Sequence, residues 1–416
     1  MPPHSARPGA DSFCKLTTQA TSVSLEGCPG ACQGLCMPAT ARQSRLNFKT
    51  VTLVLVGLIS RLGAPLLILS AALVSAVDKP SAVDLLMESG HWKQINRIAS
   101  ERLRSNPNDA QAHSWLAKTR LSYNDPEGAV VEAEKAVAID AGNAAYHAQL
   151  GEAYAMMADK SSSLKAIVFV HKMHRELDAA LAINPRQVDA LLVDMMFSWK
   201  APLLAGGNRQ RALSIADNVV SFLPSWGYLA HARLLAGKGE DARLESYLHK
   251  AAQADSSMIR PRLWLAEFYC FQAQNKRLDL AEKEARLALA IDPSAGLAYK
   301  VLAHAYAEQK RWADLDAVLA QADAASPDDL SPYHAAADAL IDIGQDFTRA
   351  EKYLQKYLTQ PPEGRQPTPA ETHWLLADLY KREGRKGDAK RELQAALRLQ
   401  PDFARAKQDL SQLSRS

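Results

Sequence analysis

The segment KVLAHAYAEQKRWADLDAVLAQADAASP, residues 300–327, contains two amphipathic helical patterns joined by a short polar stretch. In the first pattern the small residue Ala303 is followed by Tyr306 on the same helical face. In the second, Leu315 and Leu319 are one helical turn apart, and Pro327 follows. Proline lacks the N–H that a helix needs and disfavours helix in the residue before it. The segment therefore predicts a hairpin of two helices that ends at Pro327.

The same hairpin recurs along the chain at a nearly constant step. Four of the eight steps between equivalent positions are 34 residues long, and the others exceed 34 by 3 to 10 residues. The nine equivalent positions are Val83, Ala117, Gly151, Met195, Ala232, Ala266, Ala303, Ala337 and Ala377. Most are small, as expected where two helices cross closely. The spacing predicts nine consecutive hairpins.

These residues resemble a known repeat. The pattern W-x2-L-G-x2-Y, then A-x3-F, A and P at a 34-residue period, is similar to the tetratricopeptide repeat, and it covers Asp78 to Ser416. The resemblance implies an all-α, right-handed superhelical solenoid of about nine helix-turn-helix units. Phe403 to Leu413 is expected to form a C-terminal capping helix. Departures from the pattern occur at Ala141, Ser256, Arg120, Ser198, Leu235 and Met195.

The first 76 residues differ from the repeats. Residues 1–50 lack apolar periodicity and are expected to be a disordered or non-native extension. Residues 51–76 are mostly apolar, follow a basic stretch and end in small residues, which predicts a signal peptide cleaved before Val77. An uncleaved N-terminal membrane anchor is the alternative. Met37 precedes the basic stretch, and a start there gives a more usual leader length. The array is predicted to occupy residues 77–416.

Composition and cysteine placement exclude several classes of protein. The chain of 416 residues has 49 Lys+Arg against 46 Asp+Glu, a charge of +3, which lacks the electrostatic footprint of a nucleic-acid binder. Its 20 Gly and 21 Pro are too few for a collagen or low-complexity chain. Cys14, Cys28, Cys32 and Cys36 all precede the array, so Cys270 cannot form a disulfide within it.

Sequence motifs give little support for catalysis. The longest insertion in the repeat lies within residues 156–177 and contains His171 and His174, whose spacing puts both on one helical face. A metal pair and a lengthened helix with partly solvated histidines are the two interpretations. Pro202–Asn208 is expected to be a turn, and Pro361–Pro369 a spacer between units. Nucleophile-elbow, zinc-protease and dinucleotide motifs are missing from the sequence. We expect no enzymatic activity, no cofactor and no metal site.

Proteins similar to this array bind extended peptides or partner helices in a concave groove lined by the first helix of each unit. Helical spacing places these residues on that face: Lys118, Glu152, Arg260, Trp264, Glu267, Lys300, His304, Asp338, Trp374 and Asp378. Trp264 and Trp374 are candidate anchors for a partner. Their alternative role is to pack between helices.

Some members of the family hold a C-terminal carboxylate with Lys and Asn side chains of successive first helices. Lys300 matches the first of these positions, but His304, Ala335 and Glu371 occupy the others. The carboxylate clamp is therefore not supported, and the mixed charge of the groove indicates neither an acidic nor a basic ligand.

Three hypotheses follow from the sequence. The first is an exported, non-enzymatic scaffold that binds a protein or peptide partner in a bacterial periplasm. The second is a version anchored in the inner membrane by residues 51–77. The third is an enzyme, or a binder of a metal or small ligand, that uses the insertion near His171. We expect no nucleic-acid partner and membrane contact only through the N-terminal segment.

Overall fold

The computed structural model describes residues 81–272, 275–365 and 367–414. By its contacts the chain divides into two units, Met1–Lys79 and Pro80–Ser416, and all the described residues belong to the second. The predicted N-terminal extension, the signal peptide or anchor, Met37 and the four early cysteines therefore lie outside the described residues.

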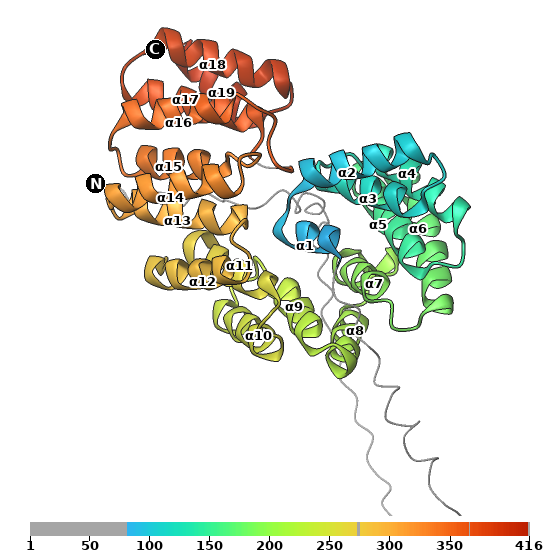
Figure 1. The fold of residues 1–416 in the computed structure, drawn as a ribbon. Helices are drawn as coiled ribbons and strands as arrows, with labels where there is room; N and C mark the ends of the chain where they lie inside the picture. Colours follow the sequence, from blue (N-terminus) through green and yellow to red (C-terminus); the bar gives the residue numbers. More distant parts are fainter. Residues whose placement is uncertain (1–80, 273–274, 366, 415–416) are drawn as a thin grey trace, which may run out of the picture. The chain divides into compact units, whose positions relative to one another are not determined.

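The described residues form nine consecutive helix pairs followed by a single helix (Figure 1). The pairs are α1 (Ala82–Ser89) and α2 (Trp92–Ser105), α3 (Ala110–Ser122) and α4 (Pro126–Ile139), α5 (Ala144–Lys160) and α6 (Ser163–Ile183), α7 (Val188–Lys200) and α8 (Arg209–Phe222), α9 (Pro224–Leu235) and α10 (Asp241–Ala254), α11 (Ile259–Glu267) and α12 (Leu278–Ile291), α13 (Gly296–Glu308) and α14 (Trp312–Ala325), α15 (Ser331–Asp342) and α16 (Phe347–Tyr357), and α17 (Pro369–Arg382) and α18 (Lys386–Leu399).

The arrangement confirms an α-solenoid of tetratricopeptide type. A short 3-10 helix, η1 (Leu203–Ala205), lies between α7 and α8, and a π-helical turn, η2 (Phe268–Gln272), follows α11. The predicted capping helix is α19 (Ala404–Leu413), which buries Ala406 completely.

The nine positions that define the repeat are all buried. The Val83 side chain, 7% exposed, is more exposed than the alanine positions. Met195 is fully buried despite its size. Gly151 is buried where α5 crosses α6, and a side chain there would meet Leu177. The fourth unit, which departs most from the repeat pattern, is therefore built like the others.

The longest insertion lengthens both helices of the third pair. First helix α5 has 17 residues and second helix α6 has 21, whereas α4, α8, α10, α12, α14 and α18 have 14 each. His171 is exposed on α6, and the His174 ring meets the Phe197 ring edge-on at 4.9 Å. This matches the lengthened-helix interpretation of the insertion.

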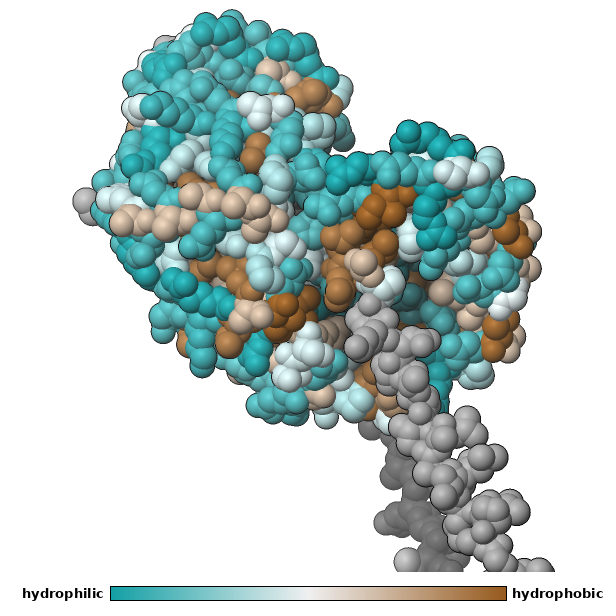
Figure 2. Space-filling model, viewed as in Figure 1, coloured by the Kyte–Doolittle hydropathy of each residue, from teal (hydrophilic) through white to brown (hydrophobic). Residues whose placement is uncertain are grey.

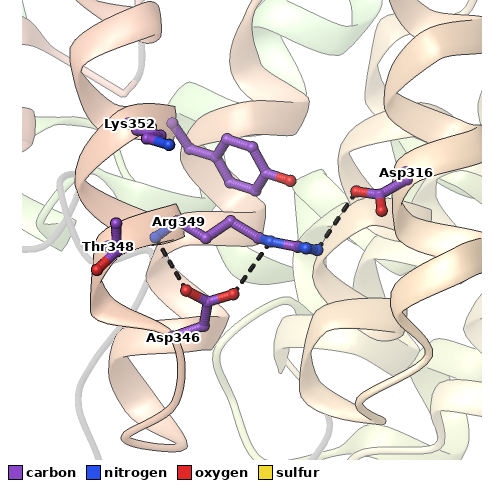
Figure 3. A pocket seen from close by; sticks show the side chains of 6 residues that line it. Asp316, Asp346, Thr348, Arg349 and Lys352 are labelled. Atoms are coloured by element: carbon purple, nitrogen blue, oxygen red, sulfur yellow. Dashed lines mark hydrogen bonds and ion pairs between the residues drawn. The ribbon is translucent and has the colours of Figure 1, made fainter.

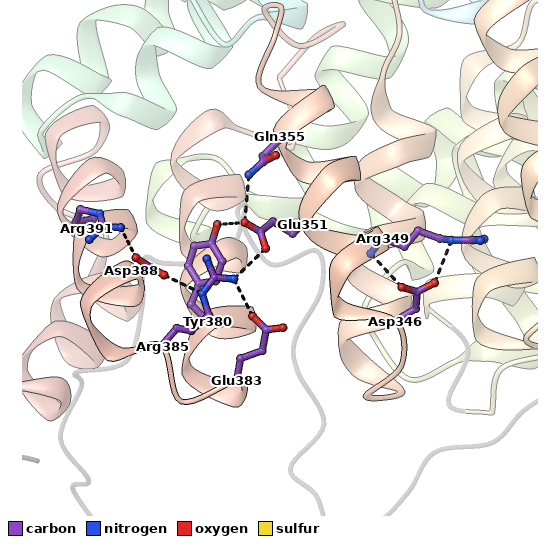
Figure 4. Close-up of polar contacts among 9 residues, drawn as sticks. All are labelled: Asp346, Arg349, Glu351, Gln355, Tyr380, Glu383, Arg385, Asp388 and Arg391. Carbon is purple, nitrogen blue, oxygen red and sulfur yellow. Dashed lines mark hydrogen bonds and ion pairs between the residues drawn. The ribbon is translucent and has the colours of Figure 1, made fainter.

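A tyrosine–glutamate–arginine bridge recurs between consecutive pairs. In one copy the Tyr306 hydroxyl donates to Glu282 of α12 at 2.9 Å, and Arg311 pairs with the same carboxylate. The Arg311 guanidinium also covers the Tyr306 ring, 4.4 Å from its centroid. Tyr380 with Glu351 and Arg385 repeats the arrangement (Figure 4). Tyr269 with Glu245 and Arg277 does so as well. The bridge fixes how each of these three pairs is oriented on the one before it.

The surface seen in Figure 2 is largely hydrophilic, with hydrophobic residues gathered in separate patches. Residues that lie deepest between the helices are mainly alanine and leucine, together with Tyr154, Tyr269 and Tyr306. The core therefore consists of thin layers between neighbouring helices, as expected of an array without a central core.

Gly227 marks a close helix crossing. A Cβ atom added there would lie 2.3 Å from the backbone nitrogen of Val220 and 2.5 Å from its Cα. These are backbone atoms of α8, so no side-chain movement can relieve the overlap. Only glycine lets α9 lie this close to α8.

We predict that Gly227→Ala destabilises the protein by about 1–3 kcal/mol, the usual range for overpacking. Urea unfolding monitored by circular dichroism measures the effect. Gly387→Ala is the matched control, because its Cβ would lie 4.0 Å from the nearest atom, a flexible Arg391 nitrogen. That variant should be unchanged or slightly more stable, since alanine favours helix over glycine. Equal destabilisation of both would contradict the packing account.

Candidate functional site

Five charged side chains from successive first helices act on one another along one side of the array. We call Lys118, Glu152, Asp189, Arg233 and Arg260 the central cluster; they come from α3, α5, α7, α9 and α11. Lys118 Nζ lies 3.5 Å from Asp189 Oδ2. Four members are half-buried and Arg233 is exposed. The cluster is thus in contact with solvent although protein surrounds it.

The electrostatics of the central cluster are coupled. The charge of Asp189 raises the pKa of Lys118, against the effect of burial, and Glu152 adds to the increase. Burial raises the pKa of Glu152, while Lys118 lowers it. Desolvation within the array lowers the pKa of Arg233, and the charge of Glu152 opposes this. The charges of Lys118, Glu152 and Arg233 are therefore coupled to one another at a site where solvation is reduced.

The structure brings together three residues that the sequence predicted, Lys118, Glu152 and Arg260. Sequence reasoning missed Asp189 and Arg233, although a signal for both exists. Arg233 directly follows the repeat position of its unit, as Lys118 and Glu152 do. Asp189 stands six residues before the repeat position of its unit, as Arg260 does. The helical phase that selected three members would have selected all five.

The other predicted residues of α11, and those of α13, lie outside this cluster. Trp264, Glu267 and Lys300 are half-buried, and the Lys300 ammonium lies 5.4 Å from the centroid of the Phe271 ring. His304 is only 3% exposed. Its Nδ1 lies 3.2 Å from the carbonyl oxygen of Ala335, and its Nε2 lies 3.1 Å from Glu308.

The hydrogen bond with His304 lowers the pKa of Glu308 to about 2, against the effect of burial. The imidazole and the carboxylate therefore form an internal polar pair that ties α13 to the neighbouring α15.

The predicted residues of α15 and α17 are placed differently again. Trp374 donates from Nε1 to Asp409 of α19 at 3.0 Å, and the Arg405 guanidinium lies 5.5 Å from its ring centroid. The capping helix therefore covers this tryptophan. Asp378 pairs with Arg382 at 3.1 Å, and Asp338 is half-buried on α15.

Polar contacts join α1 and the start of α2 to α11 and to loops of later units. We call this set the polar clasp: Glu88 with Arg260, Ser89 with Asp292, His91 with Ser294, and Lys93 with Asp328 and Glu363. These partners are 172 to 270 residues apart in sequence. Periodicity carries no signal for such contacts, and sequence reasoning missed the clasp.

Glu363 completes the N-terminus of α2 within the clasp. His91, the residue before α2, makes no side-chain capping bond. Instead Glu363 Oε1 accepts the backbone N–H of Lys93 at 2.8 Å, and Oε2 lies 3.6 Å from Lys93 Nζ. The Glu363 side chain is only 3% exposed. A carboxylate at this place is favoured by the partial positive charge of a helix N-terminus.

Two hollows accompany these features. A cavity of about 140 Å³ beside the clasp is lined by Ser89, Gly90, Trp92, Leu297, Lys300, Asp329, Ser331 and Glu363. A larger hollow of about 350 Å³ lies between α14 and α16, where Arg349 reaches from Asp346 to Asp316 (Figure 3). Neither hollow contains a cysteine or histidine among its lining residues.

The described residues give no support for catalysis or metal binding. Burial raises the pKa of the Cys270 thiol to about 12, so it is not a thiolate nucleophile. Within the described ranges no group of three or more His, Cys, Asp or Glu side chains could hold a metal ion. None of the helices described is both long and apolar enough to span a membrane.

Comparisons with known proteins find structural similarity alone. No family model and no curated protein matches the chain. The chain is similar to the structure of yeast Tom70, with 15% identity, 79% of each chain covered and a TM-score of 0.46. A tetratricopeptide repeat protein from Parabacteroides merdae is similar at 15% identity and a TM-score of 0.39, with 74% of this chain and 99% of that chain covered.

A human IFIT1 dimer with m7Gppp-AAAA is similar at 15% identity and a TM-score of 0.41, with 77% of this chain and 79% of that chain covered. These similarities are too distant to carry an argument about activity or ligand. The α-solenoid assignment rests on the nine helix pairs themselves.

We predict that Glu363 makes the closed clasp less stable as the pH rises. Burial raises its pKa from 4.5 to about 7, although the Lys93 N–H and ammonium oppose this. A carboxyl that binds its proton more tightly in the folded state stabilises that state below about pH 4.5. The contribution is lost as the pH rises through 7.

Glu363→Gln removes this titration. The unfolding free energy of the variant minus that of wild type should therefore be greater at pH 8 than at pH 5, by about 2 kcal/mol. Urea titrations at several pH values measure the difference. The contribution of His334 cancels in this comparison, because both proteins contain it. Burial lowers the pKa of His334 to about 3, so its effect on stability changes with pH in the opposite sense. Glu101→Gln, at an exposed carboxylate, is the control. A difference that does not vary with pH would exclude this role for Glu363.

Proposed function

We propose that the array is a non-enzymatic scaffold that binds an extended peptide segment of a protein partner along the central cluster. The observation that carries the proposal concerns two opposite charges, one on α5 and one on α9. Glu152 and Arg233 have no hydrogen-bond partner among the described residues, yet both lie where solvation is reduced. A peptide in the groove supplies donors to Glu152 and acceptors to Arg233.

Reduced solvation makes each of these contacts stronger than it would be on a flat surface. Charges that protein already surrounds lose little further hydration when a ligand arrives, so less of the interaction energy is spent on desolvation. Because the central cluster contains three cations and two anions, it suits a segment with both kinds of polar group. This matches the mixed charge that the sequence indicated.

Arg260 couples ligand binding to the polar clasp. Its guanidinium makes two hydrogen bonds to Glu88 of α1, at 2.9 and 3.1 Å, and lies 4.9 Å from the ring centroid of Trp226. A ligand carboxylate that binds Arg260 competes with Glu88. Binding in the groove therefore loosens one contact of the clasp.

Photo-crosslinking in cells tests the groove. A photoreactive residue in place of Glu267, which follows the repeat position of α11, should capture a protein partner. The same residue in place of exposed Lys390 on α18 should not. Arg233→Glu should reduce capture at position 267 at least tenfold, roughly the loss of one charge-assisted contact. The matched reversal Lys390→Glu should leave capture unchanged. Capture that survives Arg233→Glu, or occurs equally from position 390, would overturn the proposal.

For location we propose export to a bacterial periplasm. The basis is the order of basic stretch, apolar stretch and small residues in 1–76. The alternative is an inner-membrane anchor formed by residues 51–77. N-terminal sequencing of the purified protein distinguishes them. We predict a chain that begins at Val77. A chain that begins upstream of Leu62 would show that the segment is retained as an anchor.

A further inference from the structure

The turn that joins α5 to α6 has an unusual surface. The two helices are the longest first helix and the longest second helix among the described residues. At their junction Leu164, Ile167 and Val168 are 83%, 54% and 54% exposed. They are spaced i, i+3 and i+4, so they form one apolar stripe on the outside of α6. Hydrophobic side chains this exposed and this close together indicate a contact surface.

Basic residues surround the stripe. Between residues 160 and 175 the sequence contains Lys160, Lys165, Lys172 and Arg175 and no acidic residue. Lys160 and Lys165 are exposed and flank Leu164 in sequence, and we call these two lysines and the three aliphatic residues the α6 tip. The Lys160 ammonium also donates to the carbonyl oxygen of Asn124. The nearest exposed acidic residues in sequence are Asp159 and Asp178, one on each side of this stretch.

We infer that the α6 tip binds the surface of an anionic lipid bilayer. An apolar stripe flanked by lysines on the outside of a helix is the pattern that places aliphatic side chains among acyl chains and ammonium groups among lipid phosphates. The tip is an exposed turn, so its side chains can enter a bilayer surface directly. Binding of this kind needs no hollow in the protein.

Charge disfavours two other occupants. In a symmetric contact between two copies of the chain, Lys160 and Lys165 would approach the same residues of the second copy. Residues 1–76 contain six basic and two acidic residues, so this segment is also repelled by the α6 tip. An anionic surface is the occupant that the charge fits.

The surface is independent of the groove and of the N-terminal segment. Four of the five residues of the α6 tip lie on second helix α6, and Lys160 ends α5, eight residues after Glu152, whereas the central cluster lies on first helices. The described contacts of the array lie within Pro80–Ser416, a compact unit with its own hydrophobic core. The chain that begins at Val77 can therefore be tested without the apolar stretch 51–76, which would bind vesicles by itself.

Co-sedimentation measures binding of this chain to vesicles of phosphatidylcholine alone and of phosphatidylcholine mixed with phosphatidylglycerol. Wild type should bind the mixed vesicles and release them at high salt. The variant Leu164→Gln/Ile167→Gln/Val168→Gln should bind at least about tenfold more weakly, because it lacks the aliphatic side chains that enter the bilayer. The variant Lys160→Glu/Lys165→Glu should also bind at least about tenfold more weakly, since each basic residue contributes a factor of about five. Lys283→Glu/Lys390→Glu, which changes two exposed lysines elsewhere, should bind nearly as wild type, as should Arg233→Glu.

A second readout does not depend on how well these variants fold. Val168→Cys carrying a solvent-sensitive dye should shift to the blue with mixed vesicles, and Lys283→Cys should not; buried Cys270 remains in both. Equal binding to both kinds of vesicle, or equal binding by wild type and the tip variants, would overturn the inference. If wild type forms dimers and the tip variants do not, the surface would be assigned to a second copy of the chain. An acidic protein that binds the tip in the absence of lipid affinity would assign it to a protein partner.

Discussion

The close crossing of two helices around one small side chain is the constraint on which the whole array depends. A helix pair of this size has apolar surface on both sides and cannot bury it alone, so every pair relies on its neighbours. At Gly227 the two helices approach so closely that a single methyl group would overlap backbone atoms of α8. At the C-terminus α19 takes the place of a further pair, because the apolar face of the ninth would otherwise meet water.

Burial of apolar surface is not directional, so it cannot by itself fix the angle between successive pairs. The tyrosine–glutamate–arginine bridges supply that direction. A buried tyrosine hydroxyl needs an acceptor, and a carboxylate can accept it on one oxygen while an arginine pairs with the other. Glu282 does this between Tyr306 and Arg311. The bridge at Tyr269 sets in this way the orientation of the unit that carries Arg260 of the central cluster.

The periodic part of the structure was predictable from sequence because it depends on contacts between near neighbours. Ala303 and its equivalents identify nine pairs, and the same helical phase finds Lys118, Glu152 and Arg260. Arg233 and Asp189 share those phases and were missed only because the phase was not applied to every unit. Other features have no such signal.

The partner of Tyr306 lies 24 residues away, on the preceding unit, and Lys93 meets Glu363 across 270 residues. Contacts of the second kind depend on how far the array curves over many units. Sequence spacing says nothing about that curvature. The N-terminal assignments concern residues that the structure does not describe, and they remain predictions.

The long-range cap on α2 also has a consequence for the order of events during synthesis. Lys93 leaves the ribosome 270 residues before Glu363, the carboxylate that receives its N–H. At about 5–20 residues per second this interval is roughly 15 to 50 s. During this interval the first pair lacks its cap, and its other partners in the clasp appear one after another as Arg260, Asp292, Ser294 and Asp328 are made. The N-terminal end of the array thus completes its contacts only after most of the chain has been made.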